Sequence, residues 1–247
     1  MEQLIKLLNA PKKSLLNDLI PDPELVVLVA APHPDDFDAV AATLKLFRDN
    51  GNAIHLAVLS EAGNGVDDDF AWELGKSKAK IREEEQRASC LLFGLPETNL
   101  RFCHLDEDDN GQIAHTPDNT AKIQAIMEKL LPDIIFLPHG NDTNSGHRHV
   151  FSMVNAAMEL TGLPAIGLLN HDPKTIEMRY DFFTVFDENT QMWKAELLRC
   201  HVSQQRRNQR ARGYGFDERI ARDNRDTAMA VPGAVYAEGF EMKTWNC

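Results

Sequence analysis

The chain has 247 residues, and its 38 acidic side chains outnumber its 26 lysines and arginines, which gives a formal net charge of −12. This balance argues against nucleic acid or a membrane surface as the partner, because their phosphates attract positively charged protein surfaces. An apolar content of 43% argues against disorder and can form a sizeable core, so we expect a single domain over residues 1–247.

Five runs in the first two thirds of the chain have the composition of buried strands: residues 25–30, 54–59, 99–103, 134–137 and 165–169. Apolar residues at helical spacing predict helices between them: residues 38–50, 72–93, 120–131 and 148–160. Strands that alternate with crossover helices predict an α/β fold, with a Rossmann-like, mostly parallel sheet and helices on both faces.

The pattern changes after Thr175. A strand-like stretch, residues 176–186, precedes a long charged helical region, and the chain ends in a small segment that contains aromatic residues. We therefore expect an α/β core over about residues 25–172 and a C-terminal elaboration over about residues 173–247. Because ligands of open parallel sheets bind beyond the carboxyl ends of the strands, the loops that follow the strands are the places to search for a site.

Features of membrane and secreted proteins are missing from the sequence. The apolar run at residues 25–31 is far shorter than the about 20 residues that span a bilayer. Residues 1–6 lack the basic and apolar segments of a signal peptide. The four cysteines are widely spaced without a CxxC pair, so neither a disulfide framework nor a thiolate zinc site is indicated. We expect a cytoplasmic protein without a membrane span.

The first strand leads into a loop, residues 31–38 (APHPDDFD), that places one imidazole and three carboxylates within six residues. Imidazole and carboxylate are common ligands of Zn²⁺ and of non-haem Fe²⁺. The adjacent Asp35 and Asp36 could point in different directions, so that one binds a metal and the other accepts a proton from water. An alternative is that these carboxylates only cap the next helix. His33 and the prolines beside it favour the metal site.

The fourth strand leads into a second polar loop, residues 139–149 (HGNDTNSGHRH), which holds three of the nine histidines. His147 and His149 would diverge by about 200° on a regular helix, so they could not easily share one metal ion. We expect one of them to be a ligand and the other to pack or to lie on the surface. Two such loops at one sheet edge favour a binding site.

These loops resemble a known family. His33-Pro34-Asp35-Asp36 resembles the HPDD signature of the LmbE/PIG-L deacetylases, which hydrolyse N-acetyl groups on glucosamine derivatives. Residues 142–148 (DTNSGHR) resemble the family's second metal motif, and residues 194–204 (KAELLRCHVSQ) are similar to its K…H.SQ segment. Softer matches lie at residues 82–94 and 237–240. All of these matches follow the family order over roughly residues 25–241, which is most of the chain.

The resemblance implies a divalent ion held by His33, Asp36 and His147. Zn²⁺ is the most common ion in the family, and Fe²⁺, Mn²⁺ or Co²⁺ could use the same donors. It also implies that Asp35 is the general base and that the substrate is a small N-acetylated sugar or a related amide. Three protein ligands and one open position are typical of catalytic zinc.

The chain departs from the family pattern at two places. Asn144 and Gly146 stand where many members carry His and Asp, so His201 could supply an imidazole that stabilises the oxyanion or protonates the leaving amine. Phe37 stands where relatives often have Glu, and the next carboxylate, Asp38, is expected to cap the helix or support the ligands. Five residues are expected to contact the substrate or to support the site: Arg82, Lys194, Asp38, Asp142 and Asn144.

An arginine-rich segment interrupts the acidic chain. Between residues 199 and 225, eight arginines oppose three acidic residues. They could form a solvated helical face with ion pairs such as Glu218 with Arg222, or one or two of them could bind an anionic group of the substrate. Residues 213–215 could form a mobile loop beside the site. Residues 61–69 could be a pocket wall or a plain solvated loop.

Two other functions compete with amide hydrolysis. Two histidines and one carboxylate also form the metal site of Fe²⁺ oxygenases, although those enzymes usually have all-β barrels. A sugar-binding relative without activity is the other alternative, and the complete set of four residues (His33, Asp35, Asp36 and His147) argues against it. Some relatives are homo-oligomers, and the sequence leaves the oligomeric state open.

Overall fold

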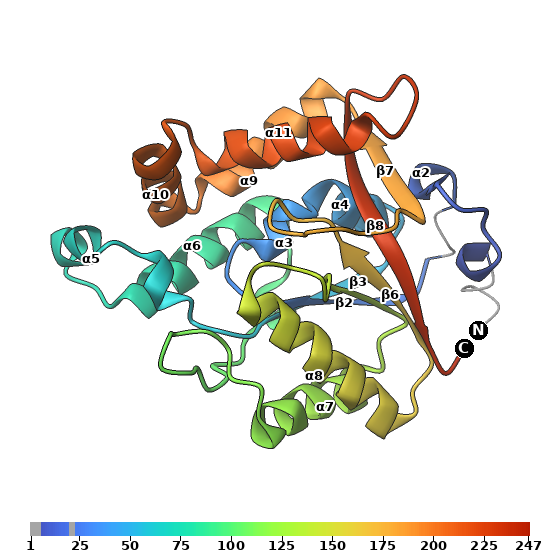
Figure 1. Ribbon diagram of the computed structural model, residues 1–247, viewed down its shortest axis with the longest axis horizontal. Helices are drawn as coiled ribbons and strands as arrows, with labels where there is room; N and C mark the ends of the chain where they lie inside the picture. Colours follow the sequence, from blue (N-terminus) through green and yellow to red (C-terminus); the bar gives the residue numbers. More distant parts are fainter. Residues whose placement is uncertain (1–5, 20–22) are drawn as a thin grey trace.

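A twisted sheet of eight strands forms the centre of the computed structural model, which describes residues 6–19 and 23–247 (Figure 1). Residues 1–5, which form most of the stretch inspected for a signal peptide, lie outside the described residues. The strands are β1 (Ser14–Leu15), β2 (Val26–Ala31), β3 (Ala53–Val58), β4 (Leu100–Phe102), β5 (Ile134–Pro138), β6 (Ala165–Asn170), β7 (Phe182–Phe186) and β8 (Tyr236–Trp245). Their order is β1-β7-β8-β6-β5-β2-β3-β4.

Most neighbouring strands are parallel, and only β8 runs antiparallel to its two neighbours, β6 and β7. The predicted α/β class with a mostly parallel sheet is therefore confirmed. The two strands of the C-terminal part, β7 and β8, belong to the same sheet as β2 to β6.

Helices cover both faces of this sheet (Figure 1). They are α2 (Leu16–Leu19), α3 (Asp36–Ala39), α4 (Ala41–Asp49), α5 (Asp68–Leu74), α6 (Lys78–Phe93), α7 (Pro117–Leu130), α8 (Ser145–Thr161), α9 (Glu188–Arg199), α10 (Val202–Arg212) and α11 (Phe216–Ala228), with short 3₁₀ turns at Gly63–Gly65 and Glu97–Asn99. None of these helices combines the length and the apolar composition that crossing a membrane requires.

One long predicted helix, residues 72–93, is in fact two helices. Gly75 ends α5 with φ at +60°, a conformation that costs glycine little. Ser77 then caps α6 by accepting a hydrogen bond from the backbone N–H of Lys80. The predicted helix at residues 38–50 is likewise divided, at Val40, into α3 and α4.

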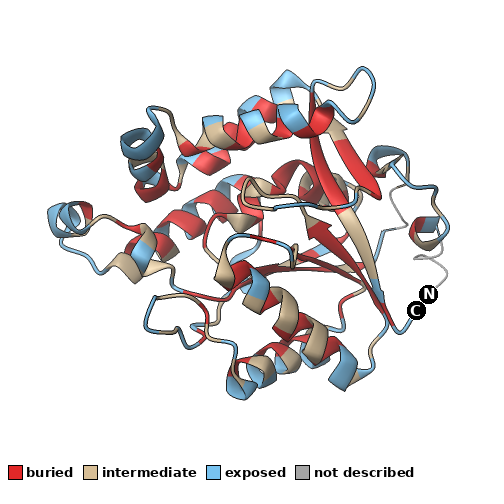
Figure 2. Cartoon of the chain, in the orientation of Figure 1, coloured by how far each residue is buried: buried red, intermediate tan, exposed pale blue. Residues whose placement is uncertain are grey.

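The core has two layers because successive residues of a strand face opposite sides of the sheet. Val27 and Val29 of β2 pack in the layer that contains residues of α3, α4, α6 and α9. Leu28 and Ala30 pack in the other layer, with α7 and α8. Figure 2 shows that the central strands of the sheet are mostly buried, while the helices expose their outer faces. The sheet therefore holds its strand ends in fixed positions.

The last strand is the main feature that the sequence pattern missed. The small terminal segment forms β8, ten residues long, inside the sheet rather than beside it. Glu238 interrupts its apolar pattern, yet this carboxylate is buried and binds the ammonium group of Lys194 at 2.6 Å. The predicted strand at residues 176–186 shortens to β7, since residues before Phe182 form a loop.

The carboxyl ends of β2, β5 and β6 lie at one edge of the sheet, because these neighbouring strands are parallel. The loops that follow them begin at residues 32, 139 and 171 and meet at that edge. An isolated β-bridge between Asp142 and Thr175 joins the second loop to the third. This is the place where the sequence predicts a site.

Candidate metal centre and active site

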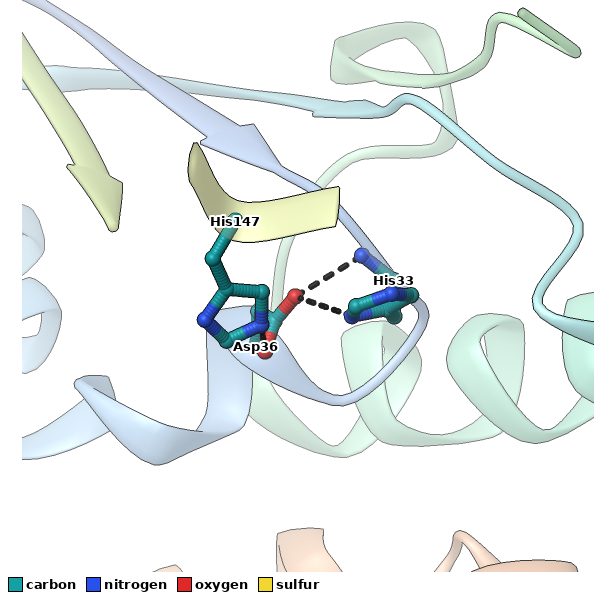
Figure 3. Close-up of side chains that lie close together, drawn as sticks. All are labelled: His33, Asp36 and His147. Carbon is teal, nitrogen blue, oxygen red and sulfur yellow. Dashed lines mark hydrogen bonds and ion pairs between the residues drawn. The ribbon is translucent and has the colours of Figure 1, made fainter. Parts of the chain in front are cut away.

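His33, Asp36 and His147 lie together at this edge, with one potential ligand atom of each within 4.8 Å of the others (Figure 3). His33 comes from the turn between β2 and α3, Asp36 is the first residue of α3, and His147 comes from the first turn of α8. Asp36 Oδ2 accepts a hydrogen bond from the backbone N–H of His33 at 2.7 Å. Its other oxygen lies 3.8 Å from His147 Nε2. The fold thus brings together the three ligands that the family resemblance implies.

The His147 ring has one nitrogen bound and one nitrogen free. Its Nδ1 lies 3.0 Å from Asp142 Oδ2, and both side chains are buried. Its Nε2 is buried without a hydrogen-bond partner among the described residues. Donation from Nδ1–H to a carboxylate leaves the Nε2 lone pair for a metal ion, an arrangement common to metal-binding histidines. This free nitrogen beside a carboxylate and a second imidazole fits a divalent metal ion.

The charges of this cluster support one another. Burial opposes ionisation of Asp36, but the hydrogen bond from His33 and the positive charges of His33, His147 and Lys174 hold the pKa of Asp36 well below its usual range. Burial likewise lowers the pKa of His147, but the hydrogen bond to Asp142 and the charge of Asp36 outweigh burial and raise it above the ordinary value. Asp36 is therefore a carboxylate at neutral pH, as a ligand must be.

Asp35 occupies a strained position next to these ligands. Its φ is +114°, in the left-handed region, which costs a residue with a side chain about 1–3 kcal/mol. Its backbone N–H donates to Gln86 Oε1 at 3.0 Å, and its carboxylate accepts from Arg82 at 2.8 Å. It makes no side-chain hydrogen bond that caps α3, so the capping alternative is not observed for Asp35.

Arg82 is the buried residue that holds this carboxylate. Its side chain is almost fully buried and also donates to the carbonyl oxygen of Pro34, to Glu85 and to Ser203. The guanidinium group thus joins α6 to the turn that carries Asp35. Arg82 also lines the cavity described below, so its place is compatible with either expected role, contact with the substrate or support of the site.

Asp38 and His201 form a buried pair behind this turn. His201 Nε2 lies 2.6 Å from Asp38 Oδ2, and both side chains are fully buried. The same oxygen accepts a hydrogen bond from Gln86 at 3.3 Å, and Ser89 donates to the other oxygen. Neither Asp38 nor His201 lines the cavity described below. Because Gln86 also binds Asp35, this pair lies behind the strained turn rather than in the cavity.

A cavity of about 560 Å³ opens beside the His33, Asp36 and His147 cluster. Its walls include His33, Asp35, Arg82 and Asn144 from the predicted site, and residues Ala62, Asn64 and Gly65 from the stretch that the sequence left as a pocket wall or a solvated loop. The pocket-wall interpretation is therefore the one that the structure supports. A volume of this order is typical of sites for small molecules.

Asn144 is oriented by the helix that it precedes. Its Oδ1 accepts a hydrogen bond from the backbone N–H of Gly146 at 2.8 Å, as the N-cap of α8. The amide NH₂ is therefore the end that is left to donate. Gly146 leaves space, since a Cβ there would lie 3.0 Å from Gln112 Oε1 and 3.5 Å from His33 Nε2.

Three neighbours of the site were missed by the sequence argument: Gln112, Asp172 and Lys174. Gln112 lines the cavity, and its Oε1 is buried without a partner among the described residues. Asp172 groups with Asp142 and His147, and burial raises the pKa of Asp172. Its place just after β6 could have been recognised by the rule that found His33. Gln112 gave no such signal, because it belongs to a long loop.

Two predicted residues lie elsewhere. The Nδ1 atom of His149 lies 2.6 Å from the carbonyl oxygen of Ile113, so of the two candidates only His147 joins the metal cluster. Lys194 does not line the cavity. Its buried ammonium group donates to Glu238, to Asn224 and to the carbonyl oxygen of Ala39. Of the two roles expected for Lys194, contact with the substrate or support of the site, its position fits support, because it joins α9 to α3 and β8.

Residues 28–158, slightly more than half of the chain, match the family model of PIG-L, described as GlcNAc-PI de-N-acetylase. The chain belongs to the PIG-L family. This confirms the family that the motifs resemble. The comparison with curated protein sequences found no match for this chain.

Several solved structures share the fold. The N,N'-diacetylchitobiose deacetylase from Pyrococcus horikoshii, complexed with its inhibitor MPG, has 17% identity and a TM-score of 0.72 over 90% of this chain and 84% of its own. GalB, the 4-carboxy-2-hydroxymuconate hydratase from Pseudomonas putida KT2440, has 19% identity and a TM-score of 0.64 over 89% and 95%. The zinc-inhibited form of teicoplanin deacetylase Orf2 has 14% identity and a TM-score of 0.65 over 89% and 98%. At these identities the likeness is one of fold.

Proposed function

We propose that the protein is a metal-dependent N-deacetylase that releases acetate from an N-acetylated amino sugar or a related small amide. The observation that carries this proposal is the buried, unpartnered His147 Nε2, which faces Asp36 and His33 beside a cavity lined by Asp35. Membership of the PIG-L family and the deacetylases among the structural neighbours support the same reaction.

His33, Asp36 and His147 would hold the divalent ion, which we propose to be Zn²⁺. When bound, the ion would polarise the amide carbonyl and make a water molecule more acidic. Teicoplanin deacetylase Orf2, a neighbour of the same fold, was solved in a zinc-inhibited form, which supports testing both zinc binding and inhibition by zinc in the present protein. Fe²⁺, Mn²⁺ and Co²⁺ remain alternatives, because the same donors bind them.

Asp35 would act as the general base. It lines the cavity, and Arg82 and Gln86 fix its carboxylate and its backbone in one conformation. A base held in place in this way can accept a proton from water and return it to the leaving amine. We assign the return of the proton to Asp35 rather than to His201, because His201 is buried away from the cavity.

Asn144 and His201 would support the reaction in different ways. The free NH₂ group of Asn144 could donate a hydrogen bond to the carbonyl oxygen as negative charge develops on it. His201 would act as a positioning residue, because its contact with Asp38 leads through Gln86 to the backbone of Asp35. The imidazole predicted from the sequence thus keeps a role in the proposal without touching the substrate.

The test is a panel of N-acetylated sugars scored for free amine, with protein that has been chelated and then supplied with Zn²⁺ from below one equivalent upward. We expect turnover of at least one substrate that requires added metal, with inhibition at excess zinc. The panel is repeated with Fe²⁺, Mn²⁺ and Co²⁺ in place of Zn²⁺. If no sugar releases amine with any of these four ions, the proposed function is contradicted. Oxygen uptake measured in the same samples tests the iron oxygenase alternative.

A second candidate function is the addition of water to an unsaturated carboxylate, and the cationic wall of the cavity favours it. GalB is described as a hydratase of a substrate that carries carboxyl groups, and the cavity of the present protein is lined by several cationic side chains. A metal-assisted addition of water to an unsaturated carboxylate would use the same ligands and the same base. Loss of the ultraviolet absorption of an unsaturated dicarboxylic acid, without release of amine or acetate, would support this second function.

A further inference from the structure

The eight arginines between residues 199 and 225 fall into two groups in the structure. Five of them have polar partners: Arg199 with Asp217, Arg206 with Asp69 and Glu73, Arg210 with Asp67 and Asp69, Arg222 with Glu218, and Arg225 with Tyr236. The side chains of the other three, Arg207, Arg212 and Arg219, have no ion-pair or hydrogen-bond partner within the part of the chain that the structure describes. A solvated helical face with ion pairs therefore accounts for five of the arginines, and the role of the other three needs another explanation.

These three arginines are also the arginines of the segment that line the cavity beside His33. Arg207 and Arg212 come from α10, and Arg219 comes from α11. Two further cations line the cavity wall: Arg82, which pairs with Asp35, and the half-buried Lys174 from the loop after β6. The chain as a whole carries a formal charge of −12, so three neighbouring arginines without an acidic partner among the described residues are not the average character of its surface.

The cavity wall offers almost no negative charge to balance these groups. Asp35 is the one carboxylate among the residues that line it, and Arg82 already pairs with Asp35. Like charges gathered in a concave site raise the local concentration of a ligand of opposite charge. A guanidinium group can also donate two parallel hydrogen bonds to a carboxylate or a phosphate. An anionic ligand would therefore give these three arginines the ionic partner that they lack among the described residues.

We propose that Arg207, Arg212 and Arg219 form an anion-binding subsite, and that the substrate carries a phosphate or carboxylate group beyond the bond that reacts. The identity of the reacting bond rests on the proposed function, whereas the anionic character of the substrate does not. The cavity of about 560 Å³ has room for a ligand that reaches from His33 to the arginines. The subsite selects the substrate, and the metal ligands and Asp35 act on it.

The direct test is calorimetric binding of matched pairs by the metal-loaded protein. Glucosamine 6-phosphate is compared with glucosamine, and N-acetylmuramic acid with N-acetylglucosamine, so that phosphate and carboxylate are tested separately. We expect the anionic member of at least one pair to bind about tenfold or more tightly, with a preference that falls as salt is added. Equal affinities within both pairs would overturn the proposal.

Two sets of variants locate the effect. R207A/R212A/R219A is expected to bind both members of a pair alike, whereas R222A, on the same helix as Arg219 but paired with Glu218, keeps the preference. An anion preference that survives in the triple variant would place the subsite elsewhere and overturn the assignment. Melting temperatures of both variants close to that of the parent protein exclude misfolding as the cause; R207Q/R212Q/R219Q serves if the triple alanine variant is unstable.

Binding and turnover separate this inference from the proposed function. Tight binding of the anionic ligands without acetate release from any N-acetyl compound would support the subsite and contradict the deacetylase. Acetate release from neutral and anionic substrates with the same kcat/KM, unchanged in the triple variant, would support the deacetylase and contradict the subsite.

Discussion

The part of the chain that matches the family model and the part that follows it contribute different groups to one cavity. Residues 28–158 supply His33, Asp35 and Asn144, together with the buried partners that fix them. The later part supplies Lys174 and three arginines, and the side chains of these arginines have no described ionic partner. The first group is suited to a reaction that demands fixed geometry, and the second to recognition of a variable substrate. We infer that this chain places the groups for the reaction in one part and the groups that select the substrate in the other.

The physical basis of this difference is the support beneath each group. His147 is buried and bound to Asp142, and Asp35 is held by Arg82 and Gln86. Arg207 and Arg212, by contrast, are exposed side chains on the surface of α10. Substitutions in the first part should therefore stop the reaction, whereas those in the second should change which substrate is used.

The largest effect is expected for His147→Ala. Removal of one of three ligands should leave the protein without tightly bound metal and reduce kcat/KM by about a thousandfold or more. Metal content by mass spectrometry and acetate release would be measured together. His149→Ala, on the same helix but outside the cluster, is the matched control and should keep both. A His147→Ala protein with full metal content and full activity would show that the ligand assignment is wrong.

Asp35→Asn should separate metal binding from catalysis. The amide cannot accept a proton from water, so kcat should fall by about 10²- to 10⁴-fold while metal content remains that of the parent. Asn also tolerates the positive φ at this position, so the turn should keep its shape. If acetate release were unchanged in a protein that binds metal normally, Asp35 would not be the base.

Lys194→Met tests the contribution of the C-terminal part to the fold. The substitution leaves Glu238 buried without its ionic partner, which should lower the free energy of unfolding by about 3–5 kcal/mol. Urea denaturation measures this change, and Lys129→Met, at an exposed position on α7, is the control. A Lys194→Met protein as stable as the control would show that this pair is not needed to anchor β8.

The smallest effect is expected for Arg219→Ala alone. With a phosphorylated substrate, loss of one charged hydrogen-bond donor should raise KM by about tenfold and leave kcat nearly unchanged. The KM of the neutral counterpart should not change. A fall in kcat with both substrates would place Arg219 in the reaction rather than in substrate recognition, and would break the division between the two parts of the chain.

The sequence predicted the parts of the molecule that follow simple patterns. Continuous apolar runs identified β2, β3, β5 and β6, since strands buried on both faces need apolar residues on both. The rule that ligands bind beyond strand ends led to the loops of His33 and His147, and the family resemblance named the three ligands that the fold brings together.

The missed features depend on contacts between distant segments. The strand β8 contains Glu238, which reads as a surface residue until its contacts with Lys194 and Thr43 are known. Gln112 lies in a loop whose sequence gives no clue to the cavity that it lines. The arginines could be sorted only in part. The sequence suggested the pair of Arg222 with Glu218, but the acidic partners of Arg206 and Arg210 lie about 140 residues away.

The most direct test of the central claim is a metal titration of the chelated protein with acetate release and bound metal followed in the same samples. The account predicts that activity returns in proportion to one divalent ion per chain, and that His147→Ala recovers neither metal nor activity under the same conditions. Full acetate release by protein shown to contain no metal would contradict it.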